Sequence, residues 1–222
     1  MRVVYHNNQT KLEKKSKDTW NLTVNWEGPT KKFWINFPYP LLKIIKQTNN
    51  INDSYKQFTI KAESVKSLAS FLKEKKNHLS YDSSIEMLFD LGNQLQSLER
   101  FYMGIPFMDI NDIIVVDEKH YFYLNDNKLL DIKNNKLDID EPYKKSLFFS
   151  PELDNIKQLP TSISYKAGFY SLASMVVFCM LDDKITEDNK NAVMAPIYTS
   201  KLYWALMRML EKDPSDRFYL II

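Results

Sequence analysis

Alternating apolar and polar side chains predict strands in the first 60 residues. Every second side chain from Trp20 to Trp26 is apolar, which is the period of a half-buried strand. Residues 27–30 have the composition of a turn, and the apolar run at 33–37 is predicted to return as the second strand of a hairpin. A further short strand is predicted at 57–60.

A helical period replaces this alternation after residue 62. Apolar positions three and four residues apart predict a helix over 63–76, with lysines on its other side. A second helix is predicted to start at Ser83, because Ser83 and Glu86 have the spacing of a capping box. Its apolar stripe continues to Leu98.

Two more helices are predicted in the last third of the chain. The segment 165–181 is apolar nearly all round, which is typical of a helix at the centre of a domain. Cys179 lies in this segment, and we expect its thiol to be buried and unreactive. The segment 199–210 is amphipathic.

The region between the helices is predicted to contain a hairpin and a long loop. Residues 112–117 and 120–125 are two short apolar runs separated by two polar residues, which favours a β-hairpin. A polar, lysine-rich loop is predicted over 126–145, and a compact apolar segment follows at 146–153. The order of elements predicts an α+β fold.

Composition excludes several classes of function. The 222 residues carry 30 Lys and Arg against 28 Asp and Glu, a balance unlike that of nucleic-acid-binding proteins. A single cysteine excludes a disulfide framework and a cysteine-based zinc site, and the three histidines lack the spacing of metal ligands. The four glycines are too far apart to form a phosphate-binding loop. We expect a cytoplasmic protein without a signal peptide or a membrane partner, because no apolar run reaches the length of a membrane span.

Two segments carry a family resemblance. Phe149-Ser-Pro-Glu-Leu153 resembles the Ala-Pro-Glu segment that closes the activation loop of eukaryotic protein kinases. Met209-Leu-Glu-Lys-Asp-Pro-Ser-Asp-Arg217 resembles the segment before the last helix of the same superfamily. The resemblance covers residues 81–222, and it implies a two-lobed α+β fold. That fold would have a reduced, β-rich N-terminal lobe at 1–80 and a mostly helical C-terminal lobe at 81–222.

The same resemblance implies one structural ion pair and a degraded catalytic set. Glu152 and Arg217 match the residues that form a buried ion pair in the family. Phe107 falls at the position of the catalytic base, where a proton acceptor is required. Asp112 replaces the metal-binding Asn, and Asp126 matches the metal-binding Asp that precedes Phe-Gly.

Other family positions are matched only weakly. Asp109 lies two residues from the base position and is a candidate base if the loop is slipped. Lys61 is the candidate for the nucleotide-binding lysine, with Glu74 as its partner on the following helix. Gly168 stands where the family has an Asp that holds the catalytic loop. No intact set of catalytic residues remains.

These losses predict a catalytically inactive, kinase-like protein that acts as a protein-interaction or scaffolding module, with protein partners and no cofactor. One alternative is a divergent Ser/Thr kinase that uses ATP and Mg²⁺, with Lys61, Asp112 and Asp126 as ligands and Asp109 as base. A second alternative is a structural protein unrelated to kinases. The high Asn, Lys and Ile content and the short length resemble degenerate kinase-like proteins of large DNA viruses, which implies a location in the host cell or the virion.

Overall fold

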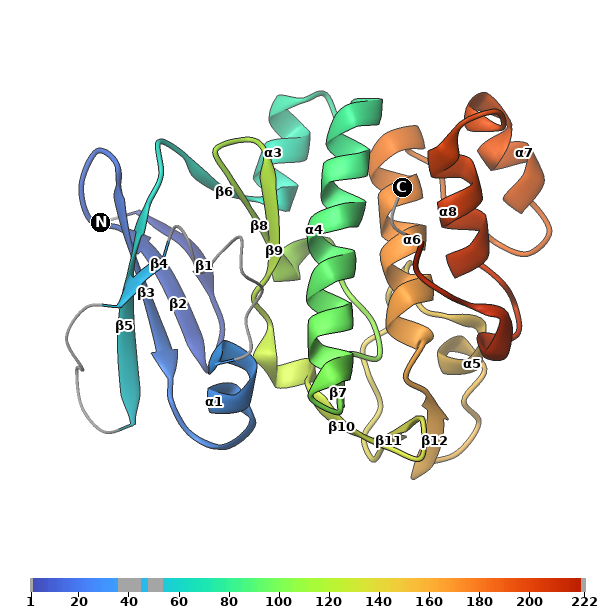
Figure 1. Ribbon diagram of the computed structural model, residues 1–222, viewed down its shortest axis with the longest axis horizontal. Helices are drawn as coiled ribbons and strands as arrows, with labels where there is room; N and C mark the ends of the chain where they lie inside the picture. The colour runs from blue at the N-terminus through green and yellow to red at the C-terminus, as the bar shows by residue number, and fades with distance from the viewer. Residues whose placement is uncertain (1, 36–44, 48–53, 221–222) are drawn as a thin grey trace.

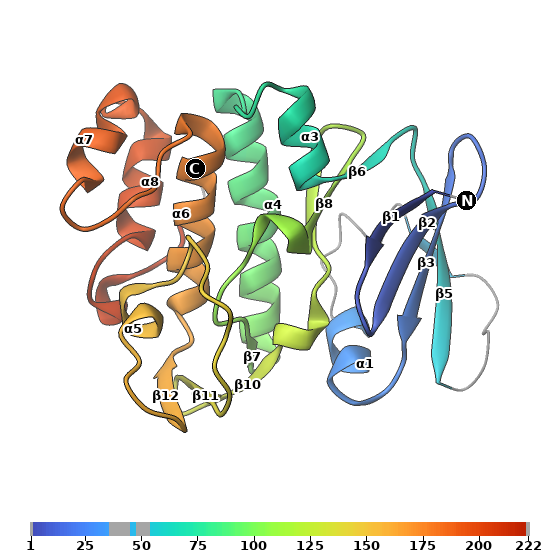
Figure 2. The same cartoon turned by 180° about the vertical axis from the view of Figure 1, so that it is seen from behind.

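The computed structural model describes residues 2–35, 45–47 and 54–220. These residues form an α+β fold in which every described sheet is antiparallel. A five-stranded sheet lies at the N-terminal end of the molecule and the long helices lie towards the other end, with strands β7, β10, β11 and β12 below them (Figure 1). The view from behind shows the same division, with helix α1 at the lower edge of the N-terminal sheet (Figure 2).

The N-terminal sheet has the strand order β1-β2-β3-β5-β4. Trp20, Leu22 and Val24 are buried on one face of its central strand, so the predicted alternation at 20–26 is confirmed. The strands are β1 (Val3–His6), β2 (Thr10–Lys14), β3 (Thr19–Asn25), β4 (Ile45–Gln47) and β5 (Tyr55–Lys61).

Helix α1 (Gly28–Ile35) takes the place of the predicted turn and returning strand. The strand prediction at 33–37 is therefore wrong for 33–35, and its last two residues lie outside the described residues. Three consecutive apolar residues at 33–35 have no period, so tertiary packing decides between strand and helix. Here Phe33 is buried with its ring 6.5 Å from that of Tyr123, and Trp34 is buried beside it.

A three-stranded sheet of order β6-β8-β9 joins the N-terminal sheet to the helices. The predicted hairpin is present as β8 and β9. The helix predicted over 63–76 is shorter, because Ser67 accepts a hydrogen bond from Ser70 N and caps α3 at that point. The elements are β6 (Val65–Ser67), α3 (Leu68–Glu74), β8 (Ile113–Val116) and β9 (His120–Tyr123).

Helix α4 (Tyr81–Arg100) begins earlier than predicted. Ser80, rather than Ser83, is the N-cap, and its Oγ accepts a hydrogen bond from Ser83 N at 3.1 Å. Gly92 lies against the ring of Tyr219 from the C-terminal segment, and a Cβ at this position would overlap that ring. The close approach explains a glycine in the interior of a long helix.

The predicted loop at 126–145 is wrong, because it contains a β-hairpin. The hairpin belongs to a sheet of order β12-β11-β10-β7. Asn134 and Asn135 form its turn with φ angles of 51° and 61°, the left-handed backbone that a two-residue hairpin requires and Asn tolerates. The strands are β7 (Met103–Gly104), β10 (Leu130–Lys133), β11 (Lys136–Ile139) and β12 (Thr161–Ser164).

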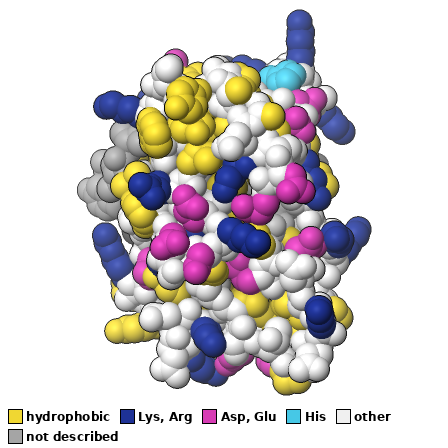
Figure 3. Space-filling view, turned by 90° about the vertical axis from the view of Figure 1, so that its right-hand side faces the viewer, with side chains coloured by type: hydrophobic (Ala, Val, Ile, Leu, Met, Phe, Trp, Pro, Cys, Tyr) yellow, Lys and Arg dark blue, Asp and Glu magenta, His cyan; other side chains and the backbone are white. Residues whose placement is uncertain are grey.

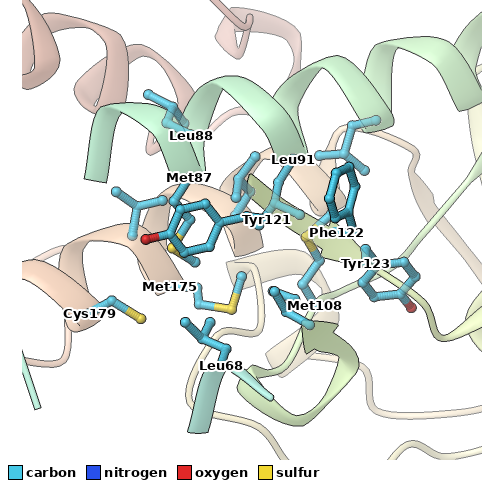
Figure 4. Close-up of a cluster of buried hydrophobic side chains, with 14 of the residues drawn as sticks. Leu68, Met87, Leu88, Leu91, Met108, Tyr121, Phe122, Tyr123, Met175 and Cys179 are labelled. Atoms are coloured by element: carbon cyan, nitrogen blue, oxygen red, sulfur yellow. The ribbon is translucent and has the colours of Figure 1, made fainter. Parts of the chain in front are cut away.

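The main core lies between α4, α6 and the β8–β9 hairpin, as Figure 4 shows with Tyr121 and Met175 pointing into it. Helix α6 is buried along nearly its whole length, and Cys179 is fully buried. Burial raises the pKa of the Cys179 thiol to about 12, which leaves it protonated and confirms its expected environment. The remaining helices are α5 (Pro151–Asp154), α6 (Ala167–Leu181), α7 (Lys190–Met194) and α8 (Lys201–Met209), with 3₁₀ turns η1 (Ile110–Asp112), η2 (Asp126–Lys128), η3 (Ala195–Ile197) and η4 (Pro214–Asp216).

Within the ranges 2–35, 45–47 and 54–220, none of the helices combines the length and the apolar character needed to cross a bilayer.

Candidate functional site

The expected pairing of Glu152 with Arg217 is present in the structure. Glu152 lies in α5 and Arg217 directly follows η4, and two hydrogen bonds of 2.5 and 2.8 Å join the guanidinium to both carboxylate oxygens. Arg217 is fully buried, and its remaining donors reach the carbonyls of Glu211 and Lys212. Its guanidinium also lies 4.9 Å from the ring centre of Tyr170. The buried guanidinium is therefore fully compensated by protein acceptors, and the carboxylate of Glu152, with its side chain 19% exposed, has both oxygens bonded.

A second buried group of charges lies where the N-terminal sheet meets the rest of the molecule. We call Phe107, Asp112, Asp126 and Lys128 the central cluster. Asp112 ends η1 and Asp126 begins η2, and the β8–β9 hairpin between them brings the two turns together. Asp112 and Asp126 are only 6% and 4% exposed, so ionising either one is costly unless a positive group or hydrogen-bond donors compensate it.

Asp112 is compensated from within the chain. Its Oδ2 accepts hydrogen bonds from Lys128 Nζ at 2.5 Å and from the backbone N of Asp109 at 3.1 Å. Its Oδ1 accepts one from Asn125 Nδ2 at 2.7 Å. Burial raises the pKa of Asp112, and the Lys128 ammonium is the strongest influence in the opposite direction. Both carboxylate oxygens are thus already engaged.

The Lys128 ammonium lies between a carboxylate and an aromatic ring. Besides its bond to Asp112, Nζ is 3.8 Å from the ring centre of Phe107, a close cation–π contact. Phe107 is buried, and edge-on contacts with Tyr143 and Phe149 at 5.2 and 4.6 Å between ring centres hold its ring in place. The ring and the carboxylate together fix the position of this cation.

Asp126 is buried with less compensation. Neither of its carboxylate oxygens makes a hydrogen bond of normal geometry within the described residues. Burial raises its pKa, while the polar side chains of Thr30, Trp34 and Asn7 act in the opposite direction. Thr30 and Trp34 belong to α1 and Asn7 to the turn after β1, so the N-terminal half closes over this carboxyl group.

Asp109, the alternative base candidate, is engaged in local structure. It caps η1 by accepting a hydrogen bond from Asn111 N at 3.2 Å, and its other oxygen accepts one from Ser146 Oγ at 3.1 Å. These contacts tie Asp109 to its own loop and to the segment before α5.

The structure does not bring Lys61 to the two buried aspartates. Lys61 is exposed and pairs with Thr19 at the start of β3, whereas α1, which faces Asp126, follows the other end of that strand. The expected partner Glu74 instead forms an ion pair with Lys66 at 2.5 Å. The carboxylate-bound lysine of the central cluster is Lys128.

Two further residues of this region belong to α6: Gly168, which the resemblance placed where the family has an Asp that holds the catalytic loop, and Ser171, whose role was not predicted from the sequence. Ser171 Oγ accepts a hydrogen bond from Met108 N at 2.9 Å and so holds the loop that contains Phe107. Gly168 lets the start of α6 approach the same loop, because a Cβ there would lie 2.6 Å from the carbonyl oxygen of Ile105. A serine inside an apolar helix is the sequence signal for this contact, because a buried hydroxyl needs a partner.

A cavity lies away from the central cluster. Its volume is about 530 Å³, and residues of β10, β11 and β12 line it, among them Asp131, Asp138 and Ser162. Asp138 is already bonded to Lys133 and Ser162, and Asp131 lies 3.8 Å from Lys32. Two of the three aspartates that line this cavity, Asp131 and Asp138, are therefore paired with lysines.

No model of a known protein family matches the sequence, and no curated protein matches it significantly. Among the described parts of the chain, no three His, Cys, Asp or Glu side chains are arranged to hold a metal ion.

Proposed function

We propose that the protein is a degenerate relative of the protein kinases that does not transfer phosphate and acts by binding other proteins in the cytoplasm. The Glu152–Arg217 pair supports the kinship, because it joins the two segments on which the resemblance rests. The β-rich N-terminal half and the helical C-terminal half support it as well (Figure 1).

The position of Lys128 carries the proposal that catalysis is lost. Phosphoryl transfer needs metal ions that neutralise phosphate and a group that accepts the proton of the attacking hydroxyl. In this chain the ammonium of Lys128 binds Asp112 at 2.5 Å, so an internal cation occupies the carboxylate that would bind metal. At the base position, the ring of Phe107 has no proton acceptor and covers that cation instead.

The residues present do not fit Mg²⁺-bound ATP. A metal at Asp112 would have to displace the ammonium of Lys128, which is only 15% exposed, from its carboxylate partner and from the ring of Phe107. Asn7, Thr30 and Trp34 already face the second carboxyl group, Asp126.

A thermal-denaturation titration with millimolar ATP and Mg²⁺, run beside a phosphate-transfer assay on a generic protein substrate, tests the proposal. A ligand at 100 times its dissociation constant adds about 2.7 kcal/mol to stability, which such a titration readily detects. We expect no shift and no transfer.

The alternative hypothesis is an active kinase, and it predicts both a thermal shift and phosphate transfer. Its candidate residues are Lys61, Asp109, Asp112 and Asp126. A Mg²⁺-dependent shift, or phosphate transfer that Asp126→Asn abolishes, would overturn our proposal. Asp138→Asn is the control, because it makes the same Asp-to-Asn change at a carboxylate outside the central cluster.

A further inference from the structure

Helix α8 presents an unusual outer face. Its inner side chains, among them Leu202 and Leu206, are buried in the core, while Lys201, Trp204 and Arg208 point outward. These three residues follow each other at helical spacing, so they form one line along the helix. Trp204 is 56% exposed, and an exposed apolar side chain indicates a binding surface when it is part of a contiguous patch.

Two more aromatic side chains extend this line. Tyr198, just before α8, is 59% exposed and contacts Tyr203, whose ring lies 5.2 Å from that of Trp204. At the other end, Phe218 is 43% exposed and lies under the guanidinium of Arg208 at 5.4 Å. We call Tyr198, Lys201, Trp204, Arg208 and Phe218 the α8 stripe.

Figure 3 looks onto the end of the molecule that carries α7 and α8. Apolar side chains gather in its upper part, and a band of mixed charges lies below them. Helix α8 itself contains no carboxylate, and neither Lys201 nor Arg208 forms an ion pair within the described residues. The stripe therefore offers, among exposed aromatic rings, two cations that have no ion-pair partner in the part of the chain that the structure describes.

We infer that the α8 stripe is a docking surface for an acidic segment of another protein. Carboxylates of that segment pair with Lys201 and Arg208, and its apolar side chains pack on Trp204 and Phe218. Exposed Trp, Tyr and Arg side chains are the residues that most often dominate the free energy of protein–protein binding. The inference rests on the proposed protein-binding function and assigns the binding site to the α8 stripe.

Charge argues against a second copy of this chain as the occupant. In a symmetric dimer, two antiparallel α8 helices that meet at Trp204 bring Lys201 of one copy against Arg208 of the other. Like charges placed together across an interface are destabilising.

A membrane and a nucleic acid fit the stripe less well than an acidic protein segment does. A helix that lies on a membrane inserts its apolar face, whereas the apolar face of α8 is already buried in the core. Nucleic-acid binding needs many phosphate contacts, while the stripe has two cations and the whole chain has a formal net charge of only +2.

Selection from a random peptide library displayed on phage tests the inference. The library is first depleted on Trp204→Ala/Arg208→Ala protein and then selected on the wild type. We expect the selected peptides to be rich in Asp and Glu next to aromatic or aliphatic residues. Failure to select any binder, or selection of neutral or basic sequences, would contradict the inference.

Charge reversal sharpens the result. Arg208→Glu should weaken a selected peptide about tenfold or more, and a peptide with Lys in place of its key acidic residue should regain affinity. Arg100→Glu is the matched control, because Arg100 is an exposed arginine beside the exposed Phe101 on another face. Equal losses for both variants would overturn the assignment.

Two further measurements distinguish the other occupants. Self-association in sedimentation that depends on Trp204 would identify a second copy of this chain as the occupant and contradict the inference. Binding to vesicles of phosphatidylserine and phosphatidylcholine that depends on Trp204 would identify a membrane and contradict it as well. None of these readouts involves ATP, so the α8 stripe and the loss of catalysis can fail separately.

Discussion

The molecule contains two buried carboxylate–cation groups, and they are balanced differently. The Glu152–Arg217 pair has one anion, one cation and a carbonyl acceptor for each remaining side of the guanidinium. The central cluster has two buried carboxyl groups, Asp112 and Asp126, and one ammonium. The first arrangement is complete and stabilises one geometry, whereas the second leaves Asp126 short of compensation. A retained framework and an altered reactive centre would produce this contrast.

Removal of Arg217 should have the largest effect. Arg217→Ala leaves Glu152 and two carbonyls without partners and opens a cavity beside Tyr170. We expect the free energy of unfolding to fall by about 3–5 kcal/mol, measured by urea denaturation. The exposed Arg208→Ala is the control and should change stability by less than about 0.5 kcal/mol. Equal effects for the two arginines would show that the Glu152–Arg217 pair stabilises the fold no more than an exposed arginine does.

Loss of Lys128 should have a smaller effect that depends on pH. Lys128→Met keeps the length of the side chain but leaves the buried Asp112 without its cation, at a cost of about 2 kcal/mol near neutral pH. The cost should shrink in acid, because a protonated Asp112 needs no counter-ion. Lys128→Met/Asp112→Asn should restore part of the stability. A loss that the second substitution does not relieve would contradict the pairing.

Neutralising Asp126 should have the smallest effect, and the opposite sign. Its folded-state pKa is raised by burial, so the folded protein binds a proton more tightly than the unfolded chain does. Stability linked to Asp126 is therefore greatest below its unfolded pKa and falls as pH rises through its folded pKa.

Asp126→Asn should accordingly raise the free energy of unfolding by about 1 kcal/mol near neutral pH. This advantage should disappear in acid, where the carboxyl group of Asp126 is protonated in both the folded and the unfolded protein. The measurement is urea denaturation of the wild type and of Asp126→Asn at several pH values from acid to neutral. A destabilised variant at neutral pH would show that the ionised carboxylate is stabilised by its surroundings.

The sequence predicted the elements whose patterns are regular. The alternation at 20–26 and the apolar segment at 165–181 are present as β3 and α6, because side-chain period reflects burial directly. The failure at 33–35 has the opposite cause, since three consecutive apolar residues carry no period. The hairpin of β10 and β11 was predictable, because its strands alternate around Asn134 and Asn135, but its many charges suggested a loop.

The central cluster was only partly predictable. The resemblance identified the positions of Phe107, Asp112 and Asp126, but it provided no role for Lys128. The approach of Lys128 to Asp112 depends on the path of the chain through η2, which local patterns do not specify. Lys61 was chosen because it follows the strand predicted at 57–60, a feature that says nothing about which way the side chain points.

Nuclear magnetic resonance of the lysine ammonium groups tests the central claim most directly. The account predicts a slowly exchanging ¹⁵N–¹H signal from Lys128, absent in Lys128→Met, that keeps its intensity when Mn²⁺ is added at millimolar concentration with ATP. Selective loss of that signal on Mn²⁺ addition, with Asp126→Asn preventing the loss, would place a metal ion among these carboxylates and contradict the account.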